Sequence, residues 1–194
     1  MAVVYIILAY LLGSIPVGLV LARLKGRDPR TVGSGNIGAT NVMRTAGKAI
    51  GILTLAGDIA KGFLPAWLAI EAGEPKLIVA GIGVAAFLGH LFPIYLRFKG
   101  GKGVATAVGV FLALEPAAVI ILVCVFIMAL LIWRYVSLGS LIGAALMPLL
   151  LFIFAAPAAY TLAALIIAAL IFYKHRGNIR RLLQGTESRL RAKT

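Results

Sequence analysis

The sequence predicts an all-α, polytopic integral membrane protein with seven transmembrane helices, its N-terminus outside and its C-terminus inside. Of the 194 residues, 62% are hydrophobic and only 13% are charged, whereas a soluble domain is roughly 45 to 50% apolar and about 25% charged. Long uncharged runs recur along the chain, and the positive charges gather in a few segments between them. We therefore expect a single membrane-embedded domain over residues 1–194, with lipid around most of its side chains.

The uncharged runs mark the predicted spans, because about 20 apolar residues cross roughly 30 Å of hydrocarbon at about 1.5 Å per residue. The first three spans are Ala2 to Ala22, about Ala49 to Ile70, and Leu77 to Leu96. Arg23 and the basic residues after it follow the first run rather than precede it. This order favours an uncleaved first helix with its N-terminus outside.

The second half of the chain must be divided twice to give spans of reasonable length. Tyr135 to Tyr173 is uncharged throughout and about twice as long as one span needs, so we divide it near Pro157. Gly103 to Trp133 is divided at Pro116, although this leaves a short helix in front. With that division, 17 of the 19 Lys and Arg residues lie on the inner side; without it, the last two basic segments move outside and the positive-inside rule fails.

Three polar segments share the predicted inner face, namely residues 33–44, 99–103 and 174–181. The formal net charge of +13 requires an anionic partner, and loops that only had to be short and soluble would not need this mixture of Gly, Asn, Ser, His and Arg. We expect the three segments to meet in one phosphate-binding pocket at the cytosolic boundary of the bilayer.

In the first segment, Ser34 or Asn36 is expected to cap a short helix that ends near Gly47. Its N-terminus would offer unpaired N–H groups to an anion. Asn41 and Arg44 are three residues apart and share a helical face, so one anion could touch both. A glycine-rich turn with an arginine that only sets topology is the alternative.

The second segment, Gly100, Gly101, Lys102 and Gly103, precedes a predicted short span. Its backbone amides and the Lys102 ammonium could converge on phosphate oxygens. It lacks the P-loop spacing, and a plain tight turn is about equally consistent with these four residues.

In the third segment, His175, Asn178 and Arg181 recur at intervals of three and suit one helical face, beside a second basic row of Arg176 and Arg180. The alternative is a juxtamembrane anchor on acidic lipid. We prefer that alternative for Arg189, Arg191 and Lys193, but not for His175 and Asn178, because an anchor needs neither.

Some polar residues lie deeper in the predicted spans. Asp58 and Lys61 are at i and i+3 and are expected to form a structural ion pair between helices, since isolated charges in hydrocarbon are costly. His90 could be a packed, hydrogen-bonded histidine or could reach the site. Ser137 and Ser140 fall in the first turn of the sixth span. Serines in membrane helices usually bond their own backbone, but Ser140 is well placed to face a phosphate.

These segments resemble the bacterial membrane acyl-phosphate:glycerol-3-phosphate acyltransferases, the PlsY family. The resemblance rests on SGNIGATNVMR at 34–44, GHLFP at 89–93 leading to FKGGKGVAT at 98–106, and HRGNIRRL at 175–182 with Glu187 downstream. It covers essentially the whole chain. It implies transfer of a fatty acyl group from acyl phosphate to the sn-1 hydroxyl of glycerol 3-phosphate at the cytoplasmic face of the bacterial inner membrane. The products would be lysophosphatidic acid and inorganic phosphate, in the first step of phospholipid synthesis.

The resemblance also implies that Ser34, Arg44, His175 and Asn178 are needed for activity, that the glycine-rich segment binds acyl phosphate, and that Glu187 supports the structure. From the three polar segments and this resemblance together, we expect His175, Asn178 and Ser34 to be the catalytic residues. The expected phosphate ligands are Arg44, Lys102, Ser140, Asn36, Gly100, Gly101 and Gly103. Glu187, Asp58 and Lys61 are expected to give structural support.

The expected chemistry is direct transfer without an acyl-enzyme, because acyl phosphate is already a mixed anhydride. Neither an H-x-x-x-x-D pattern nor a G-x-S-x-G elbow is present. His175 is the only group in the three segments with an ordinary pKa near neutrality, but nearby arginines favour its neutral form. Our hypothesis is that His175 positions and polarises the hydroxyl while a substrate phosphate accepts the proton.

We expect no cofactor and no obligatory metal, because no cluster has the carboxylates of a dedicated metal site. Membrane lipid is an expected partner, whereas nucleic acid is not, because a basic soluble domain with interleaved aromatic residues is missing. No obligatory protein partner is expected. The best rival function is transport of an anionic metabolite, which would require a polar counterpart on the outer face, where the loops are short.

Overall fold

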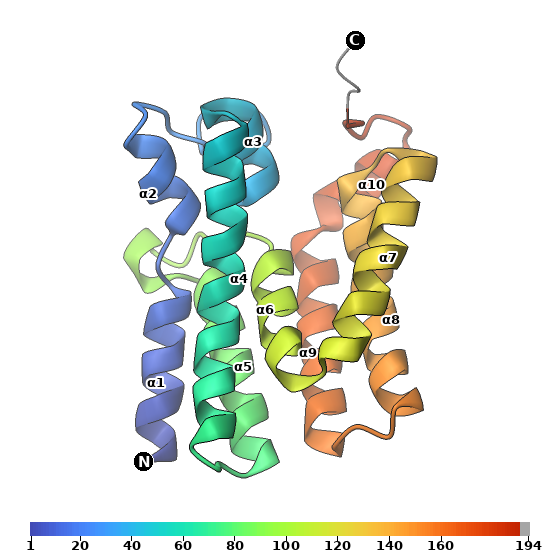
Figure 1. Ribbon diagram of the computed structural model, residues 1–194. Helices are drawn as coiled ribbons and strands as arrows, with labels where there is room; N and C mark the ends of the chain where they lie inside the picture. Colours follow the sequence, from blue (N-terminus) through green and yellow to red (C-terminus); the bar gives the residue numbers. More distant parts are fainter. Residues whose placement is uncertain (191–194) are drawn as a thin grey trace. The chain divides into compact units, whose positions relative to one another are not determined.

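The computed structural model describes residues 1–190, and the regular secondary structure in that part of the chain is entirely helical. The predicted all-α class is therefore confirmed. The helices form two compact units, residues 1–114 and a second unit that begins at Glu115, and each is described separately below (Figure 1).

The first unit is built around one long helix, α4, with the shorter helices packed along it. Figure 1 shows α3 beside the end of α4 at which α4 begins, and α1 near its other end. The helices of this unit are α1 (Ala2–Gly13), α2 (Val17–Arg23), α3 (Ala39–Ala46), α4 (Lys48–Glu71), α5 (Lys76–Leu91), the 3-10 helix η1 (Ile94–Leu96) and α6 (Val104–Leu114).

Glycine allows these helices to approach closely. A Cβ atom on Gly62 or Gly109 would overlap the backbone of the facing helix of the α4–α6 pair, at Thr106 and Ile59 respectively. A Cβ atom on Gly13 would overlap the α5 backbone at Ala86 in the same way. Small residues at helix crossings are the usual means of packing helices in lipid, where the hydrophobic effect does not drive helices together.

The first predicted span is broken in its middle. The sequence predicts one helix over Ala2 to Ala22, but the structure separates α1 from α2 at Ser14, Ile15 and Pro16. Pro16 has no N–H to continue the helical hydrogen bonds. The carbonyl of Ile15 accepts the N–H of Val17 at 3.0 Å and also the ammonium of Lys61 at 2.9 Å, so a side chain of α4 helps to hold the break.

The helix of the third predicted span is also broken, although Lys76–Leu96 as a whole is long and apolar enough to cross a membrane. The sequence predicts helix to Leu96, but α5 ends at Leu91 and Phe92 leaves it with φ −133° and ψ 60°. A residue before proline is disfavoured in the α-helical region, and Pro93 follows. The hydroxyl of Tyr10 donates to the Phe92 carbonyl at 2.7 Å, which fastens the exit from α5 to α1.

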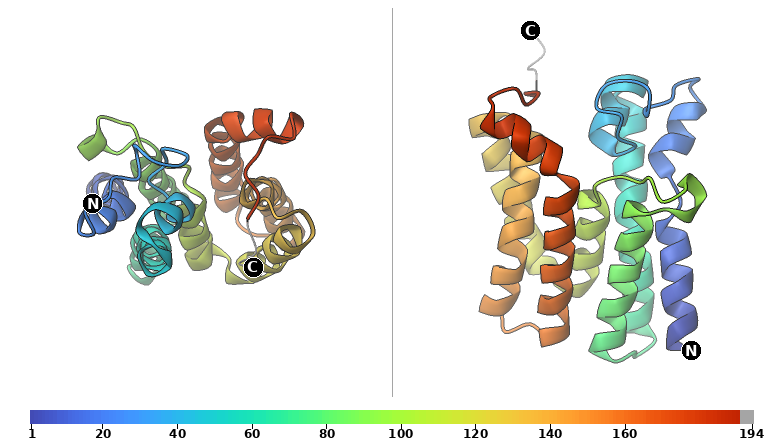
Figure 2. Two further views of the ribbon diagram at one scale, coloured as in Figure 1. Left: turned by 90° about the horizontal axis from the view of Figure 1, so that it is seen from above. Right: turned by 180° about the vertical axis from the view of Figure 1, so that it is seen from behind.

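The second unit contains three consecutive helices that run alternately up and down, followed by a short helix across one end (Figures 1 and 2). They are α7 (Pro116–Trp133), α8 (Val136–Ile153), α9 (Ala158–Lys174) and α10 (Arg176–Leu183). Pro116 occupies the first position of α7, where a missing N–H costs nothing. The predicted divisions at Pro116 and Pro157 are both confirmed, and α10 bends from α9 by 60°.

Within residues 1–190, five segments are long and apolar enough to cross a membrane, with Ala2–Arg23 counted as one, and the bent α9–α10 pair would be a sixth. The eleven-residue α6 is about 16 Å long, against roughly 30 Å of hydrocarbon. A helical membrane protein with several spans is thus supported. The seventh crossing and the outside N-terminus remain predictions.

Candidate functional site

Asn41 organises the first polar segment from a buried position on α3. Its Oδ1 accepts a hydrogen bond from the Ser34 N–H at 3.0 Å, while its Nδ2 lies within 2.8 to 3.2 Å of the carbonyl oxygens of Pro29, Val32 and Asn36. One side-chain amide therefore holds four residues of the loop that precedes α3. The expectation that Asn41 and Arg44 share an anion is wrong, because Asn41 is 3% exposed and its amide is used by backbone.

The start of α3 also differs from the prediction. The residue before the helix is Gly38, with no side-chain cap, so neither Ser34 nor Asn36 caps α3. The Oδ1 atom of Asn36 instead accepts from the N–H of Gly38 at 2.7 Å, which forms a local turn. The predicted end of the helix is correct, because Gly47 has φ 98°, a conformation that favours glycine. Ser34 and Arg44 are both exposed.

The glycine-rich segment lies directly on the last turn of α5. The N–H of Gly101 donates to the carbonyl of His90 at 3.1 Å. A Cβ atom would overlap the His90 carbonyl if added to Gly100, and the imidazole at Nε2 if added to Gly101. Gly103 has φ 83° and is followed at once by α6. The segment is therefore a tight connection whose glycines are required by close packing, with half-buried Lys102 among them.

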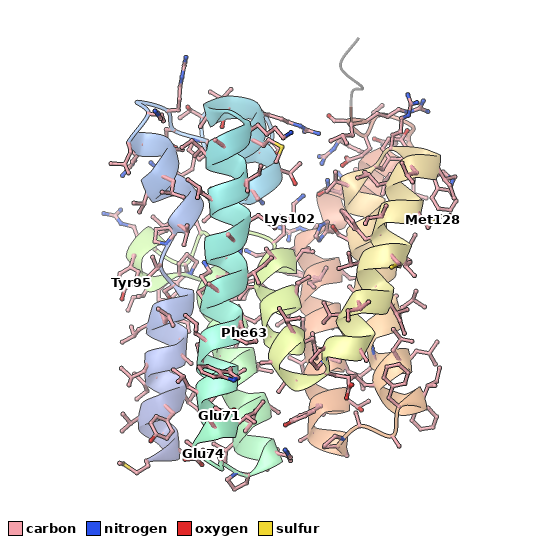
Figure 3. All side chains as sticks on the ribbon, viewed as in Figure 1. Phe63, Glu71, Glu74, Tyr95, Lys102 and Met128 are labelled. Carbon is pink, nitrogen blue, oxygen red and sulfur yellow. The ribbon has the colours of Figure 1, made fainter. Side chains whose placement is uncertain are left out.

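The predicted ion pair of α4 is present beneath this segment. The ammonium of Lys61 lies 2.9 Å from Oδ1 of Asp58, and Nδ1 of His90 lies 3.5 Å from the same oxygen. All three side chains are at most 5% exposed. His90 is thus a packed histidine that also contacts the glycine-rich segment. Figure 3 shows Lys102 beside α4, at the start of α6.

His175 terminates α9 and precedes the first residue of α10. It is 2% exposed, and Nδ1 lies 2.8 Å from the carbonyl oxygen of Ile171. Because a carbonyl oxygen only accepts, Nδ1 carries a proton, so Nε2 is the nitrogen that has the lone pair when the ring is neutral. The ring is thereby fixed in one orientation and one tautomer.

Glu187 connects α10 with the start of α8. Its Oε1 accepts from Asn178 Nδ2 at 2.6 Å and from Ser137 Oγ at 2.8 Å, while Oε2 accepts from Arg181 Nε at 2.7 Å. Burial raises the pKa of the Glu187 carboxyl, but these hydrogen bonds and the Arg181 charge outweigh burial, so the pKa is held below its ordinary value. The predicted face with Asn178 and Arg181 is present.

Ser140 bonds to its own helix, as membrane serines usually do. Its hydroxyl donates to the Val136 carbonyl at 2.9 Å, which leaves the oxygen lone pairs as possible acceptors rather than supplying a donor to phosphate. The sequence placed Ser137 and Ser140 correctly in the first turn of α8, but nothing in it indicated that Ser137 binds a carboxylate 50 residues away.

Arg189 is held by the turn between α7 and α8. Its Nε donates to the hydroxyl of Tyr135 at 3.0 Å, and its guanidinium lies over the same ring. The N–H of Leu190 donates to the Arg134 carbonyl at 2.7 Å. Arg189 therefore has an intramolecular partner in addition to any lipid. Arg191 and Lys193, for which we also prefer a lipid anchor, lie outside the described residues.

The predicted residues thus form local groups. In the first unit, the side chain of Asn41 forms hydrogen bonds with the backbone of Ser34 and Asn36. The carboxylate of Asp58 contacts Lys61 and His90 under the glycine-rich segment. In the second unit, Glu187 accepts hydrogen bonds from Ser137, Asn178 and Arg181. Sequence reasoning missed the organising role of Asn41 and the contact of Tyr135 with Arg189, for which spacing along the chain offers no signal.

Comparison with known proteins identifies the family to which this chain is similar. Residues 3–185 match the family model described as glycerol-3-phosphate acyltransferase. Curated proteins of that description include one from Trichlorobacter lovleyi, 54% identical with 95% of each chain covered, and one from Geobacter sulfurreducens, 52% identical with the same coverage.

Two solved structures of PlsY (YgiH), an integral membrane glycerol 3-phosphate acyltransferase, are also similar. The glycerol 3-phosphate form is 46% identical, with a TM-score of 0.95 over 98% of this chain and 96% of that one. The lysophosphatidic acid form is 43% identical, with a TM-score of 0.91 over 98% and 95%.

Proposed function

The chain belongs to the glycerol-3-phosphate acyltransferase family, and from this premise we propose that it moves a fatty acyl group from acyl phosphate to the sn-1 hydroxyl of glycerol 3-phosphate. The observation that carries the proposal is the pair of similar structures described as glycerol 3-phosphate and lysophosphatidic acid forms, which are the acceptor and the product of this reaction. The donor assignment rests on the PlsY resemblance and on the chemistry below.

We propose direct transfer. The hydroxyl oxygen of glycerol 3-phosphate attacks the acyl carbonyl carbon, the carbon–oxygen bond to phosphate breaks, and inorganic phosphate leaves. The hydroxyl proton ends on a phosphate oxygen. Acyl phosphate is activated well enough that an acyl-enzyme would bring little gain, and the exposed Ser34 has no adjacent base in the described contacts.

The groups around the phosphates are proposed to be cationic or N–H donors. Arg44 and Lys102 would screen the repulsion between two phosphate-bearing substrates. Ser34, Asn36 and the backbone N–H groups of Gly100 and Gly103 would supply donors as charge grows on the leaving group. Gly101 belongs to the same proposed set, although its N–H donates to the His90 carbonyl. Ser140 completes the proposed set, although its hydroxyl proton is committed to Val136.

His175 and Asn178 are proposed to orient the attacking hydroxyl. The lone pair on Nε2 of the neutral His175 ring is suited to polarise a hydroxyl group, and Glu187 fixes the amide of Asn178. His175→Ala is expected to abolish turnover at every pH. Partial activity restored by alkaline buffer alone would show instead that His175 is the base.

The reaction is proposed to take place at the cytoplasmic face of the inner membrane, with seven crossings and lipid as the only partner besides the substrates. The acyl tail can then stay among apolar helices while the phosphates stay at the polar boundary.

The deciding experiment supplies purified protein with a synthetic acyl phosphate and glycerol 3-phosphate, without other proteins. Equal amounts of inorganic phosphate and lysophosphatidic acid are expected. Acyl thioesters of coenzyme A and of acyl carrier protein serve as competing donors in parallel reactions. If a thioester supports the reaction and acyl phosphate does not, the donor assignment is wrong. If phosphate is released without acylated product, the protein is not the transferase proposed.

A further inference from the structure

Three buried ionisable side chains of the first unit have no part in the proposed chemistry. Asp58 and Lys61 of α4 and His90 of α5 meet at one carboxylate oxygen, and each is at most 5% exposed. A buried ion pair is often no more stabilising than apolar side chains of the same volume. Lys61 also donates to the Ile15 carbonyl, but stability alone gives no reason for a histidine to complete the group.

The location of His90 supplies a reason. Nδ1 of its imidazole faces Asp58 at 3.5 Å, and the opposite edge of the ring, at Nε2, faces Gly101 so closely that no Cβ atom fits between them. The His90 carbonyl also accepts the Gly101 N–H at 3.1 Å. One residue thus supports the glycine-rich segment with both its side chain and its backbone.

The same support extends to either side of Gly101. A Cβ atom on Gly100 would overlap the His90 carbonyl and the Pro93 ring, and one on Gly103 would overlap the Phe87 ring. The backbone on both sides of Lys102 is therefore in contact with α5 and with the Phe92–Pro93 turn. A small rotation of the imidazole would displace the segment that carries the Lys102 ammonium.

We propose that His90, held by Asp58, is a positioning residue that sets the conformation of residues 100–103 and thereby the affinity of the enzyme for the phosphate group of the acyl donor. Lys61 neutralises Asp58 and anchors it to the break in the first span through the Ile15 carbonyl. This inference rests on the proposed function, because it assigns a residue to the donor side of that reaction.

The test compares His90→Leu with His90→Asn. Leucine fills a similar volume without a donor, whereas the asparagine amide nitrogen can take the place of Nδ1 and face Asp58. For His90→Leu we expect the KM for acyl phosphate to rise about tenfold, as for the loss of one positioning contact with a charged group. The KM for glycerol 3-phosphate should stay unchanged within about twofold. His90→Asn should recover most of the affinity. The double variant Asp58→Leu/Lys61→Met, which removes both charges and the oxygen that faces His90, should resemble His90→Leu in its KM for acyl phosphate.

Equal rises in both KM values, or a lower melting temperature with neither KM changed, would overturn the inference, because a merely structural role has no preference for the donor. If His90→Leu does not fold, His90→Gln replaces it. Glutamine extends its amide toward the Nε2 position and away from Asp58, so its KM for acyl phosphate should exceed that of His90→Asn, and equal values would overturn the inference. Failure of the wild-type protein to form lysophosphatidic acid would refute the proposed function itself, before any variant is compared.

Discussion

The side-chain amide of Asn178 donates to Glu187 at 2.6 Å, and the same carboxylate oxygen accepts the Ser137 hydroxyl at 2.8 Å. A residue proposed to touch substrate is thereby fixed by one that the sequence places nine positions away. Because the second carboxylate oxygen binds Arg181, replacing Glu187 disturbs three donors at once.

Glu187→Ala is expected to lower the free energy of unfolding by about 1–3 kcal/mol, since it leaves partly buried donors without their acceptor. It should also lower kcat, because Asn178 loses its fixed orientation. Glu187→Gln keeps one acceptor oxygen and should be milder in both respects. Urea or thermal unfolding in detergent and steady-state kinetics measure the two effects. Equal damage from both substitutions would mean that the negative charge is the only important property of Glu187.

The contribution of the Glu187 charge should depend on pH. The pKa of the folded-state carboxyl lies below its ordinary value of 4.5, so the ionised group adds stability that is fully present above that value. This stability is lost as the pH falls through the lower folded-state pKa. The melting temperature of Glu187→Gln should therefore lie below that of the wild type at neutral pH and approach it in acid. Glu71→Gln, at an exposed position on α4, is the control and should match the wild type throughout.

Asn41→Ala should release the loop before α3. Its amide serves three carbonyls and one N–H, so the loss is expected to be about 2–4 kcal/mol, from several buried groups left unsatisfied. Asn36→Ala removes one turn hydrogen bond to Gly38 and should cost about 1 kcal/mol. Denaturation of the two variants side by side makes the comparison, and similar losses would show that the loop does not depend on Asn41.

Gly101→Ala should impair the enzyme, because the added methyl group would overlap the His90 imidazole. Gly143→Ala is the matched control, since a Cβ atom there meets nothing within 4 Å. Alanine is also more stable than glycine in a helix interior, by about 0.5–1 kcal/mol. In steady-state assays we expect a clear fall in activity for Gly101→Ala and unchanged activity for Gly143→Ala. The melting temperature of Gly143→Ala should be unchanged or slightly higher than that of the wild type. Full activity of Gly101→Ala would show that the segment can move away from α5 without loss.

The topology can be tested by labelling. In a Cys124→Ala background, which removes the single cysteine, cysteines placed at Arg27 and Leu183 should react with a membrane-impermeant maleimide only in inside-out vesicles. A cysteine at Glu74 should react only in right-side-out vesicles. Labelling of residues 27 and 183 from opposite sides would rule out the predicted seven crossings.

The fold class and most helix limits could be predicted because they follow from hydropathy and proline positions. Pro116 and Pro157 divide the spans as expected, since proline begins a helix readily and continues one poorly. At Pro16 and Pro93 the prediction of an unbroken helix is wrong. The surrounding hydropathy favours a continuous helix there, but the structure has a break at each of the two prolines. In both places a distant side chain, that of Lys61 or Tyr10, donates a hydrogen bond to a backbone carbonyl at the break.

The candidate site could be predicted as a set of residues but not as a set of contacts. The ion pair of Asp58 with Lys61 was predictable because helical periodicity places i and i+3 on one face. The partners of Asn41 and Glu187 were not, because their contacts depend on how loops fold back on helices. Asn41 matches a family motif, yet its side chain serves the backbone.

The 2.9 Å contact between Lys61 and the Ile15 carbonyl also has a consequence for biosynthesis. The ribosome makes Ile15 46 residues before Lys61, so the break in the first span is synthesised before the ammonium that will join it to α4. Until the two meet, the Ile15 carbonyl accepts the N–H of Val17 at 3.0 Å, and Lys61 is paired with Asp58 of its own helix at 2.9 Å. The contact between them is therefore expected to form only when α4 docks against the first two helices, and to join two groups that each already have a local partner.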